Sequence, residues 1–234
     1  MPNSMQILGY KPRICILLGM AYGARETAVP ARALLEPTLL LTGRSAAVVY
    51  SQPAAELKRL ADAGVIIKIA RGYYAAVPIG KQGGAWLPSM EDLTAGLASA
   101  VYGPGRGALW GLSAARVHGA VPRAIAAGYA LGPAQHRPVT LLARPGQVTF
   151  RKRDPERLDL DFLETELGPG RVTSVAQTIL DLSSRAFDDE GDPRTEAVRN
   201  LMTSVDADEL ADLAVRVRGQ AALHRARTLV AHAH

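Results

Sequence analysis

The stretch ELKRLADAGVIIKIARGYYAAV, residues 56–77, contains two hydrophobic periodicities that meet at Gly64. Before Gly64, apolar residues recur at the spacing of one helix face, and glycine commonly follows a helix end. After Gly64, β-branched and aromatic residues predict two strands, at 65–69 and 73–77, joined by a turn at Ala70-Arg71-Gly72. A short helix is therefore expected to run directly into a hairpin with a basic tip.

The residues before this stretch predict further helices. The segment PARALLEPTLLLTGRSAAVVY, residues 30–50, indicates two short helices interrupted near Pro37 and at Thr42-Gly43. Ser51 is expected to cap the next helix, and Pro53 suits a first turn, where a missing N–H breaks no hydrogen bond. Two helices, a capped third helix and a hairpin follow one another in the order of a winged helix–turn–helix.

Such a fold binds DNA with its third helix in the major groove and its wing on the flanking phosphates. With Leu57 and Leu60 facing inward, Gln52 is placed to pair with adenine, and Arg59 with guanine or a phosphate. The expected DNA-binding residues are Arg44, Gln52, Lys58, Arg59, Lys68, Arg71 and Gly72. The alternatives are a solvated helix face beside an ordinary hairpin, or a winged helix that binds protein.

Charge is unevenly distributed along the 234 residues, although the net charge is only +5. Residues 1–80 carry nine basic and four acidic side chains, and residues 81–153 carry nine and two. Residues 154–214 carry five and sixteen, whereas the last twenty carry four and none. The basic residues 1–153 favour a polyanionic partner such as double-stranded DNA. The alternative is that the acidic residues 154–214 neutralise them within one fold.

Four segments are expected along the chain. Residues 1–29 form an N-terminal extension, residues 30–80 the winged helix–turn–helix, residues 81–90 a linker and residues 91–234 a second domain. The Gly- and Pro-rich segment PIGKQGGAWLP marks the boundary, and mixed helix and strand patterns follow it. We therefore predict an α+β protein with an N-terminal winged helix and a mixed α/β C-terminal domain.

Enzymatic and membrane functions have little support in the sequence. It contains no phosphate-binding loop, nucleophile elbow or zinc-type Cys/His pairing, so we expect no catalytic residues, no metal and no cofactor. Asp159 and Asp161 fit a solvated strand edge, and GPGRG, residues 103–107, fits a plain loop. A single cysteine, Cys15, and the lack of a membrane-length apolar segment favour a cytoplasmic protein with no membrane partner.

Asp181 is the acidic residue whose role is least obvious from the pattern. It follows three apolar residues, Ala176, Ile179 and Leu180, and is expected to lie with them on a helix that Ser174 caps. A structural ion pair with an arginine of the basic middle segment, Arg116 or Arg144, is one interpretation. The other is a cation ligand of an atypical phosphotransfer enzyme.

Three sequence blocks together resemble the AbiEi-type antitoxins of bacterial toxin–antitoxin operons. They are AELKRLADAGVIIKIARGYYAAV, LWGLSAARVHGAV and RVTSVAQTILDLSS, in that order, and the resemblance covers roughly residues 30–185. The chain departs from the family pattern in its extension before about residue 30 and in the apolar bulk of TLLLTGRSAAVVY.

The resemblance implies a promoter-binding repressor of its own operon. It also implies a C-terminal domain that counteracts a cognate nucleotidyltransferase-type toxin, with or without a stable complex. One alternative is an antitoxin that acts as an atypical protein kinase on its toxin. A second is a winged-helix regulator without a toxin partner.

Overall fold

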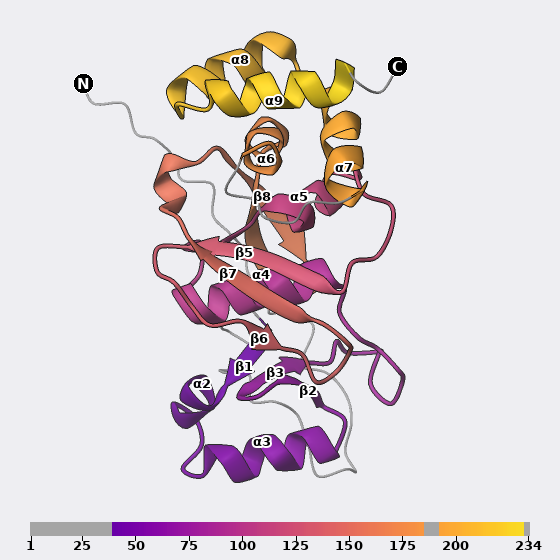
Figure 1. Cartoon of the computed structure of the whole chain (residues 1–234). Coiled ribbons are helices and arrows are strands. Elements are labelled where there is room, and N and C mark those ends of the chain that lie inside the picture. The colour runs from indigo at the N-terminus through magenta and orange to yellow at the C-terminus, as the bar shows by residue number, and fades with distance from the viewer. Residues whose placement is uncertain (1–38, 185–191, 232–234) are drawn as a thin grey trace, which may run out of the picture.

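The computed structural model describes residues 39–184 and 192–231, which form a mixed α+β fold with two β-sheets (Figure 1). The expected N-terminal extension, and most of the first helix predicted within residues 30–50, lie outside the described residues. Figure 1 shows an elongated arrangement, with the small sheet and its helices at one end and α8 and α9 at the other.

The N-terminal unit consists of a three-stranded antiparallel sheet and two helices. Its elements are β1 (Leu40–Thr42), α2 (Gly43–Ala47), α3 (Pro53–Asp62), β2 (Ile66–Ala70) and β3 (Tyr73–Ala76). β3 lies in the centre of the sheet, between β1 and β2. Leu41, Leu57, Leu60 and Ile66 pack in a small core between the sheet and the two helices.

Residues 40–42 form a strand and not the helix predicted there. Leu40 and Leu41 point to opposite faces of the sheet, and both are buried because each face is covered. Thr42 ends the strand and caps α2, where its Oγ1 accepts a 3.1 Å hydrogen bond from the Ser45 N–H. The apolar run was thus the signal of a strand buried on both sides.

The helix and hairpin predicted from residues 56–77 are present, with one difference at the helix start. Gln52, and not Ser51, is the N-cap residue of α3, and its side chain makes no capping bond. Pro53 occupies the first turn as expected. Gly64 (φ +70°) follows the helix and Gly72 (φ +84°) lies in the hairpin turn, both in the left-handed region that favours glycine.

A mixed six-stranded sheet forms the centre of the rest of the chain. Its strands are β4 (Ala108–Leu109), β5 (Ala127–Gly132), β6 (Val139–Thr140), β7 (Gln147–Lys152), β8 (Leu160–Thr165) and β9 (Gly168–Thr173). The strand order is β6-β7-β5-β4-β9-β8, so β8 is an edge strand. A 3₁₀ turn, η1 (Pro155–Arg157), connects β7 to β8.

Helices cover both faces of this sheet. One face packs against α4 (Met90–Tyr102), whereas α5 (Gly111–Val117) and α6 (Val175–Leu182) lie on the other side. Outside them lie α7 (Asp192–Met202), α8 (Ala207–Arg216) and α9 (Gln220–Ala231), which contribute to the same apolar core as α5 and α6. The Ser174 hydroxyl caps α6 as predicted, because it accepts a 3.1 Å bond from the Gln177 N–H.

The apolar core continues across the linker expected to separate two domains. Leu40 and Ile69 of the small sheet pack in one cluster with Leu93 and Leu97 of α4. Leu142 N–H also donates a 2.7 Å hydrogen bond to the Ile69 carbonyl. The linker itself is held by Glu166, which accepts hydrogen bonds from Lys81 Nζ at 2.6 Å and Trp86 Nε1 at 2.9 Å.

None of the helices that the structure describes has the length and apolar character required to cross a bilayer.

Candidate nucleic-acid interface

Helix α3 presents a polar face to solvent, as its sequence pattern predicted. Leu57 and Leu60 are buried against the small sheet. The exposed residues along the helix include Gln52, Ala55, Lys58, Arg59 and Asp62. In Figure 1, α3 lies at the outer end of the molecule, and the small sheet separates it from the large one. The helix is therefore accessible along its length to an extended partner.

The two basic residues on this face are paired within the helix. Lys58 Nζ lies 2.6 Å from Asp62 Oδ2, and Arg59 binds both carboxylate oxygens of Glu56 at 2.6 and 3.0 Å. The Arg59 hydrogen bonds lower the pKa of Glu56. Such solvent-exposed pairs at helical spacing contribute little to stability, because water screens the charges and both long side chains lose conformational freedom. Lys58 and Arg59 can therefore exchange these partners for phosphates or bases at small cost.

The cations beside the small sheet are arranged differently from those on α3. Arg44 lies on α2, Lys68 on β2 and Arg71 in the hairpin turn, and all three are exposed. Within residues 39–184 and 192–231, none of the three side chains has an acidic partner within ion-pair distance. No described acidic side chain neutralises their charge, which could therefore bind an anion.

Arg44 and Arg71 line the same cleft, which has a volume of about 390 Å³. The cleft is also lined by Thr42, Gly72, Tyr73, Ala100, Val101 and His136. Gly72 has no side chain to obstruct its mouth, and a Cβ added there would meet no atom within 4 Å. Two guanidinium groups beside a glycine without steric obstruction form a suitable binding site for a phosphate of the DNA backbone.

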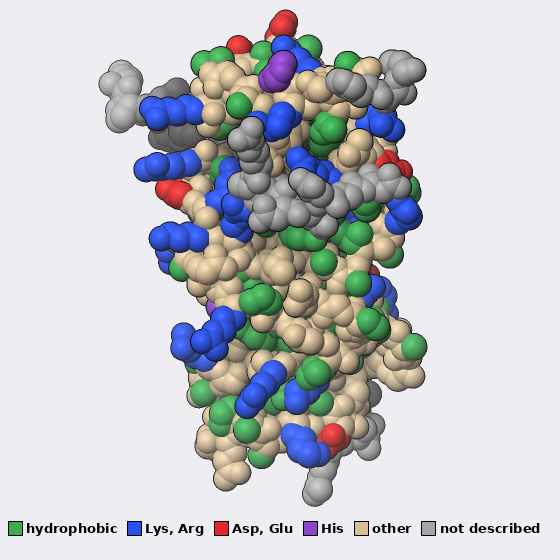
Figure 2. All heavy atoms as spheres, viewed as in Figure 1, with side chains coloured by type: hydrophobic (Ala, Val, Ile, Leu, Met, Phe, Trp, Pro, Cys, Tyr) green, Lys and Arg blue, Asp and Glu red, His purple; other side chains and the backbone are tan. Residues whose placement is uncertain are grey.

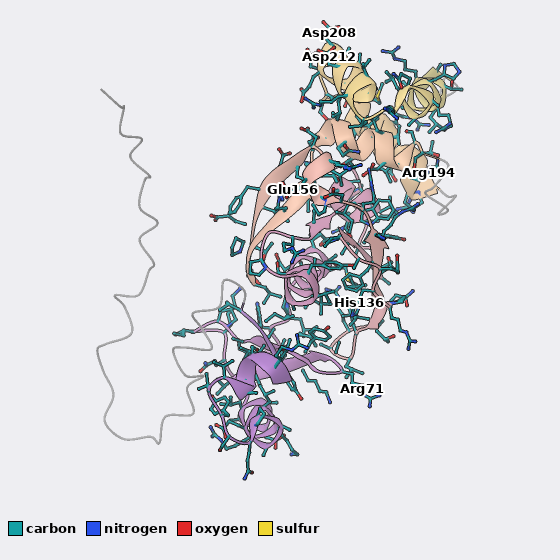
Figure 3. All side chains as sticks on the ribbon, turned by 90° about the vertical axis from the view of Figure 1, so that its left-hand side faces the viewer. Arg71, His136, Glu156, Arg194, Asp208 and Asp212 are labelled. Atoms are coloured by element: carbon teal, nitrogen blue, oxygen red, sulfur yellow. The ribbon has the colours of Figure 1, made fainter. Side chains whose placement is uncertain are left out.

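His136 is one of the residues of this cleft that the sequence did not indicate. It follows β5, 65 positions after Arg71, and reaches the cleft only because the core of the small sheet packs against α4. Figure 3 shows both side chains on the same side of the molecule. The ring packs edge-on against Phe150, with centroids 4.9 Å apart, and Nδ1 lies 2.7 Å from the Arg137 carbonyl.

Basic side chains also extend beyond the small sheet. In Figure 2 the upper and middle parts of the left-hand edge carry several Lys and Arg side chains, with few acidic ones among them. Such a surface raises the local concentration of a polyanion and increases its association rate.

The structure assigns Asp181 a partner other than those predicted. Its Oδ1 accepts hydrogen bonds from Arg153 Nη1 at 2.7 Å and Gln177 Nε2 at 2.8 Å. Arg116 is unavailable because it pairs with Glu91 at 2.6 Å, and Arg144 donates to the Pro88 carbonyl. Burial raises the pKa of Asp181, and the neighbouring Arg153 charge opposes this effect.

The remaining polar motifs form structural contacts. His118 ends α5, and its Nε2 lies 2.7 Å from the Thr173 carbonyl. Asp159 precedes β8 and lies 3.6 Å from Arg216, whereas Asp161 is exposed on that edge strand. The described residues contain no group of three or more His, Cys, Asp or Glu side chains arranged to hold a metal ion.

The chain matches no protein-family model, and no curated protein matches it.

Proposed function

We propose that the protein is a sequence-specific DNA-binding repressor whose N-terminal unit acts as a winged helix–turn–helix. In this role α3 lies in the major groove, where Gln52 and Arg59 read bases, and the β2–β3 hairpin is the wing. Arg44, Lys68 and Arg71 contact phosphates on either side of the groove. The DNA is the promoter region of the protein's own operon, and the protein acts in the cytoplasm.

The observation that carries this proposal is the contrast between paired and unpaired cations around α3. Arg44 on α2, Lys68 on β2 and Arg71 in the hairpin turn carry charge that the described part of the chain does not neutralise. Lys58 and Arg59 are held in weak pairs on the exposed face of α3. Cations without an acidic partner can bind DNA phosphates and position the protein on the duplex. Weakly paired side chains on an exposed helix can leave their partners and contact bases, so the combination suits recognition of duplex DNA.

A gel-shift titration at two salt concentrations tests this proposal. The probes are the DNA upstream of the gene and a scrambled duplex of equal length and composition. We expect tighter binding to the upstream DNA, and affinity for both probes that falls as salt rises because phosphate contacts release counterions. Equal affinity for the two probes would contradict sequence-specific repression.

Substitutions separate positioning contacts from base contacts. Arg71→Ala should weaken binding to both probes and reduce the slope of log K against log salt by about one. Arg59→Ala should cost about 1–3 kcal/mol on the upstream probe and less on the scrambled one. Arg227→Ala is the matched control, because Arg227 is exposed on α9 at the opposite end of the molecule.

We further propose that the rest of the chain counteracts a nucleotidyltransferase-type toxin, as the resemblance of its sequence blocks to AbiEi-type antitoxins implies. Its support is that resemblance, together with the acidic side chains of residues 154–214. Co-expression of the protein with the product of the adjacent gene should relieve growth arrest. Failure to relieve arrest would favour a transcriptional regulator without a toxin partner.

The atypical kinase alternative predicts a different result in a purified system. Toxin and antitoxin are mixed with and without ATP and Mg²⁺, and toxin activity and mass are measured. Non-enzymatic antagonism requires no nucleotide. Inhibition that depends on ATP, with the mass of one phosphate added to the toxin, would establish the kinase alternative.

A further inference from the structure

We propose a second ligand site, for a nucleoside polyphosphate, in a cleft between the β7–β8 connection and the turn from α8 to α9. The cleft has a volume of about 860 Å³, within the range typical of small-molecule sites. Four arginines line it, two from each side: Arg153, Arg157, Arg216 and Arg218. Guanidinium groups converging from two elements are suited to bidentate binding of phosphate oxygens.

Arg153 is the fixed member of this group. Its Nη1 donates a 2.7 Å hydrogen bond to Asp181, whose side chain is only 4% exposed. Asp181 Oδ2 is also buried and has no hydrogen-bond partner among the described residues. Arg153 is thus held at the cleft wall by a carboxylate that solvent cannot reach, and its orientation is set before any ligand arrives.

Arg218 occupies a backbone position that would suit glycine. It follows the C-terminal cap of α8 with φ +57°, and it is the only described non-glycine residue with a positive φ. The left-handed conformation after a helix end favours glycine, because a Cβ is strained there. Arg218 is exposed and pairs with no acidic group in the described residues. A strained, unpaired arginine facing a cleft points to a ligand contact.

The other residues of the cleft favour a nucleotide over a simple anion. Leu158, Leu213 and Val217 supply an apolar wall on which a base can pack. Asp154 and Asp159 contribute carboxylates, which accept hydrogen bonds from ribose hydroxyls or bind a Mg²⁺ ion carried by the phosphates.

The existing ion pairs in the cleft are weak enough for a phosphate to displace them. Arg157 lies 3.3 Å from Asp154, and Arg216 lies 3.6 Å from Asp159, with both arginine side chains largely exposed. A polyphosphate carries more charge than the carboxylate that it replaces, and it engages several arginines at once. The interspersed carboxylates disfavour a continuous nucleic-acid backbone, which would have to pass over them.

This cleft is separate from the candidate DNA-binding surface. Arg216 ends α8 and Arg218 follows it. Helix α8 lies at one end of the molecule, whereas α3 and the hairpin lie at the other (Figure 1). Figure 3 likewise places Glu156 of the cleft and Asp208 and Asp212 of α8 toward the end opposite Arg71. The proposal therefore does not depend on DNA binding.

Isothermal titration calorimetry of the full-length protein tests the site. The ligands are ATP and GTP, each with and without Mg²⁺, with adenosine and inorganic tripolyphosphate as references. We expect saturable binding of at least one nucleotide, tighter than either reference because the cleft offers contacts to both parts of the molecule. No saturable nucleotide binding, or equal affinity for tripolyphosphate, would overturn the proposal.

Arg218→Gly is the decisive variant, because a structural and a ligand-binding role predict opposite results. Glycine relieves the backbone strain, so the melting temperature should be unchanged or higher, whereas nucleotide affinity should fall about tenfold with the lost guanidinium. Arg157→Gln should weaken binding similarly, and Arg227→Gln is the control. Affinity unchanged in Arg218→Gly, or binding of single-stranded oligonucleotides but not mononucleotides, would contradict the assignment.

Discussion

At the scale of single residues, Asp181 presents the sharpest conflict between burial and charge. Burial raises the pKa of its carboxyl group, and the Arg153 charge and hydrogen bond offset this only in part. The folded state therefore holds the Asp181 proton more tightly than the unfolded state does. This contribution to stability is complete below the ordinary aspartate pKa of 3.8 and is lost as pH rises through the folded-state pKa.

The substitution Asp181→Asn should remove this pH dependence. Asparagine keeps an oxygen that can accept from Arg153 and Gln177, but it does not ionise. We expect the free energy of unfolding of the variant, relative to the natural protein, to increase from about pH 4 upward. Urea unfolding at several pH values measures the difference. Asp161→Asn, at an exposed position of the edge strand, is the control. If the free energy of unfolding of Asp181→Asn, relative to the natural protein, fell as pH rose, this account would be contradicted.

At the scale of elements, the β2–β3 hairpin depends on one glycine. Arg71 and Gly72 form the turn, and Gly72 has φ +84°, a conformation that suits glycine. Gly72→Val should lower the free energy of unfolding by about 1–2 kcal/mol, from backbone strain alone, because no atom lies within 4 Å of the added Cβ. Gly72→Asn should cost less, since asparagine tolerates this region.

Gly43→Ala provides the comparison for this hairpin prediction. The position is equally open, but its backbone is not in the left-handed region. We expect little change in its unfolding midpoint in urea. A similar loss in Gly43→Ala and Gly72→Val would show that backbone conformation is not the cause.

Elements whose stability depends on local pattern were predictable from the sequence, and elements built by distant pairing were not. The run QVTFRK forms β7 (Gln147–Lys152), and its β-branched and aromatic residues are typical of a strand. AGYALG and GPGRVT form β5 and β9 although they are rich in Gly, Ala and Pro. β5 is held by hydrogen bonds to β4 and β7, whereas β9 pairs with its hairpin neighbour β8 and, at Val172, with the distant β4; local propensity reports none of these pairings.

Among the candidate DNA-binding residues, too, local pattern predicts some features and tertiary packing determines others. Helical spacing correctly placed Gln52, Lys58 and Arg59 on an exposed face. Spacing alone could not show that Lys58 and Arg59 are paired while Arg71 has no acidic partner among the described residues, because these contacts depend on side-chain geometry. His136 joins the cleft through the packing of the small sheet on α4, and no local motif marks it.

At the scale of the whole molecule, the apolar core joins the two halves that the Gly- and Pro-rich linker suggests are separate. Leu97 of α4 is fully buried in the cluster that also holds Leu40 and Ile69 of the small sheet and Val148 of the large one. Backbone hydrogen bonds reinforce this contact, since Leu39 N–H donates to the Leu167 carbonyl at 2.8 Å. A shared core of this kind couples the unfolding of both sheets.

The substitution Leu97→Ala tests whether the two sheets unfold as one unit. Removing a fully buried leucine should cost about 2–5 kcal/mol, a large fraction of typical domain stability. If the core is shared, hydrogen exchange should show protection lost by similar amounts in the β2–β3 hairpin and in β5 and β7. If the two sheets unfold as one unit, Leu57→Ala, in the small core beneath α3, should likewise reduce protection in both sheets. Loss confined to one sheet in Leu97→Ala would instead indicate two independent domains, and the DNA-binding role proposed for the hairpin would then not require the rest of the chain.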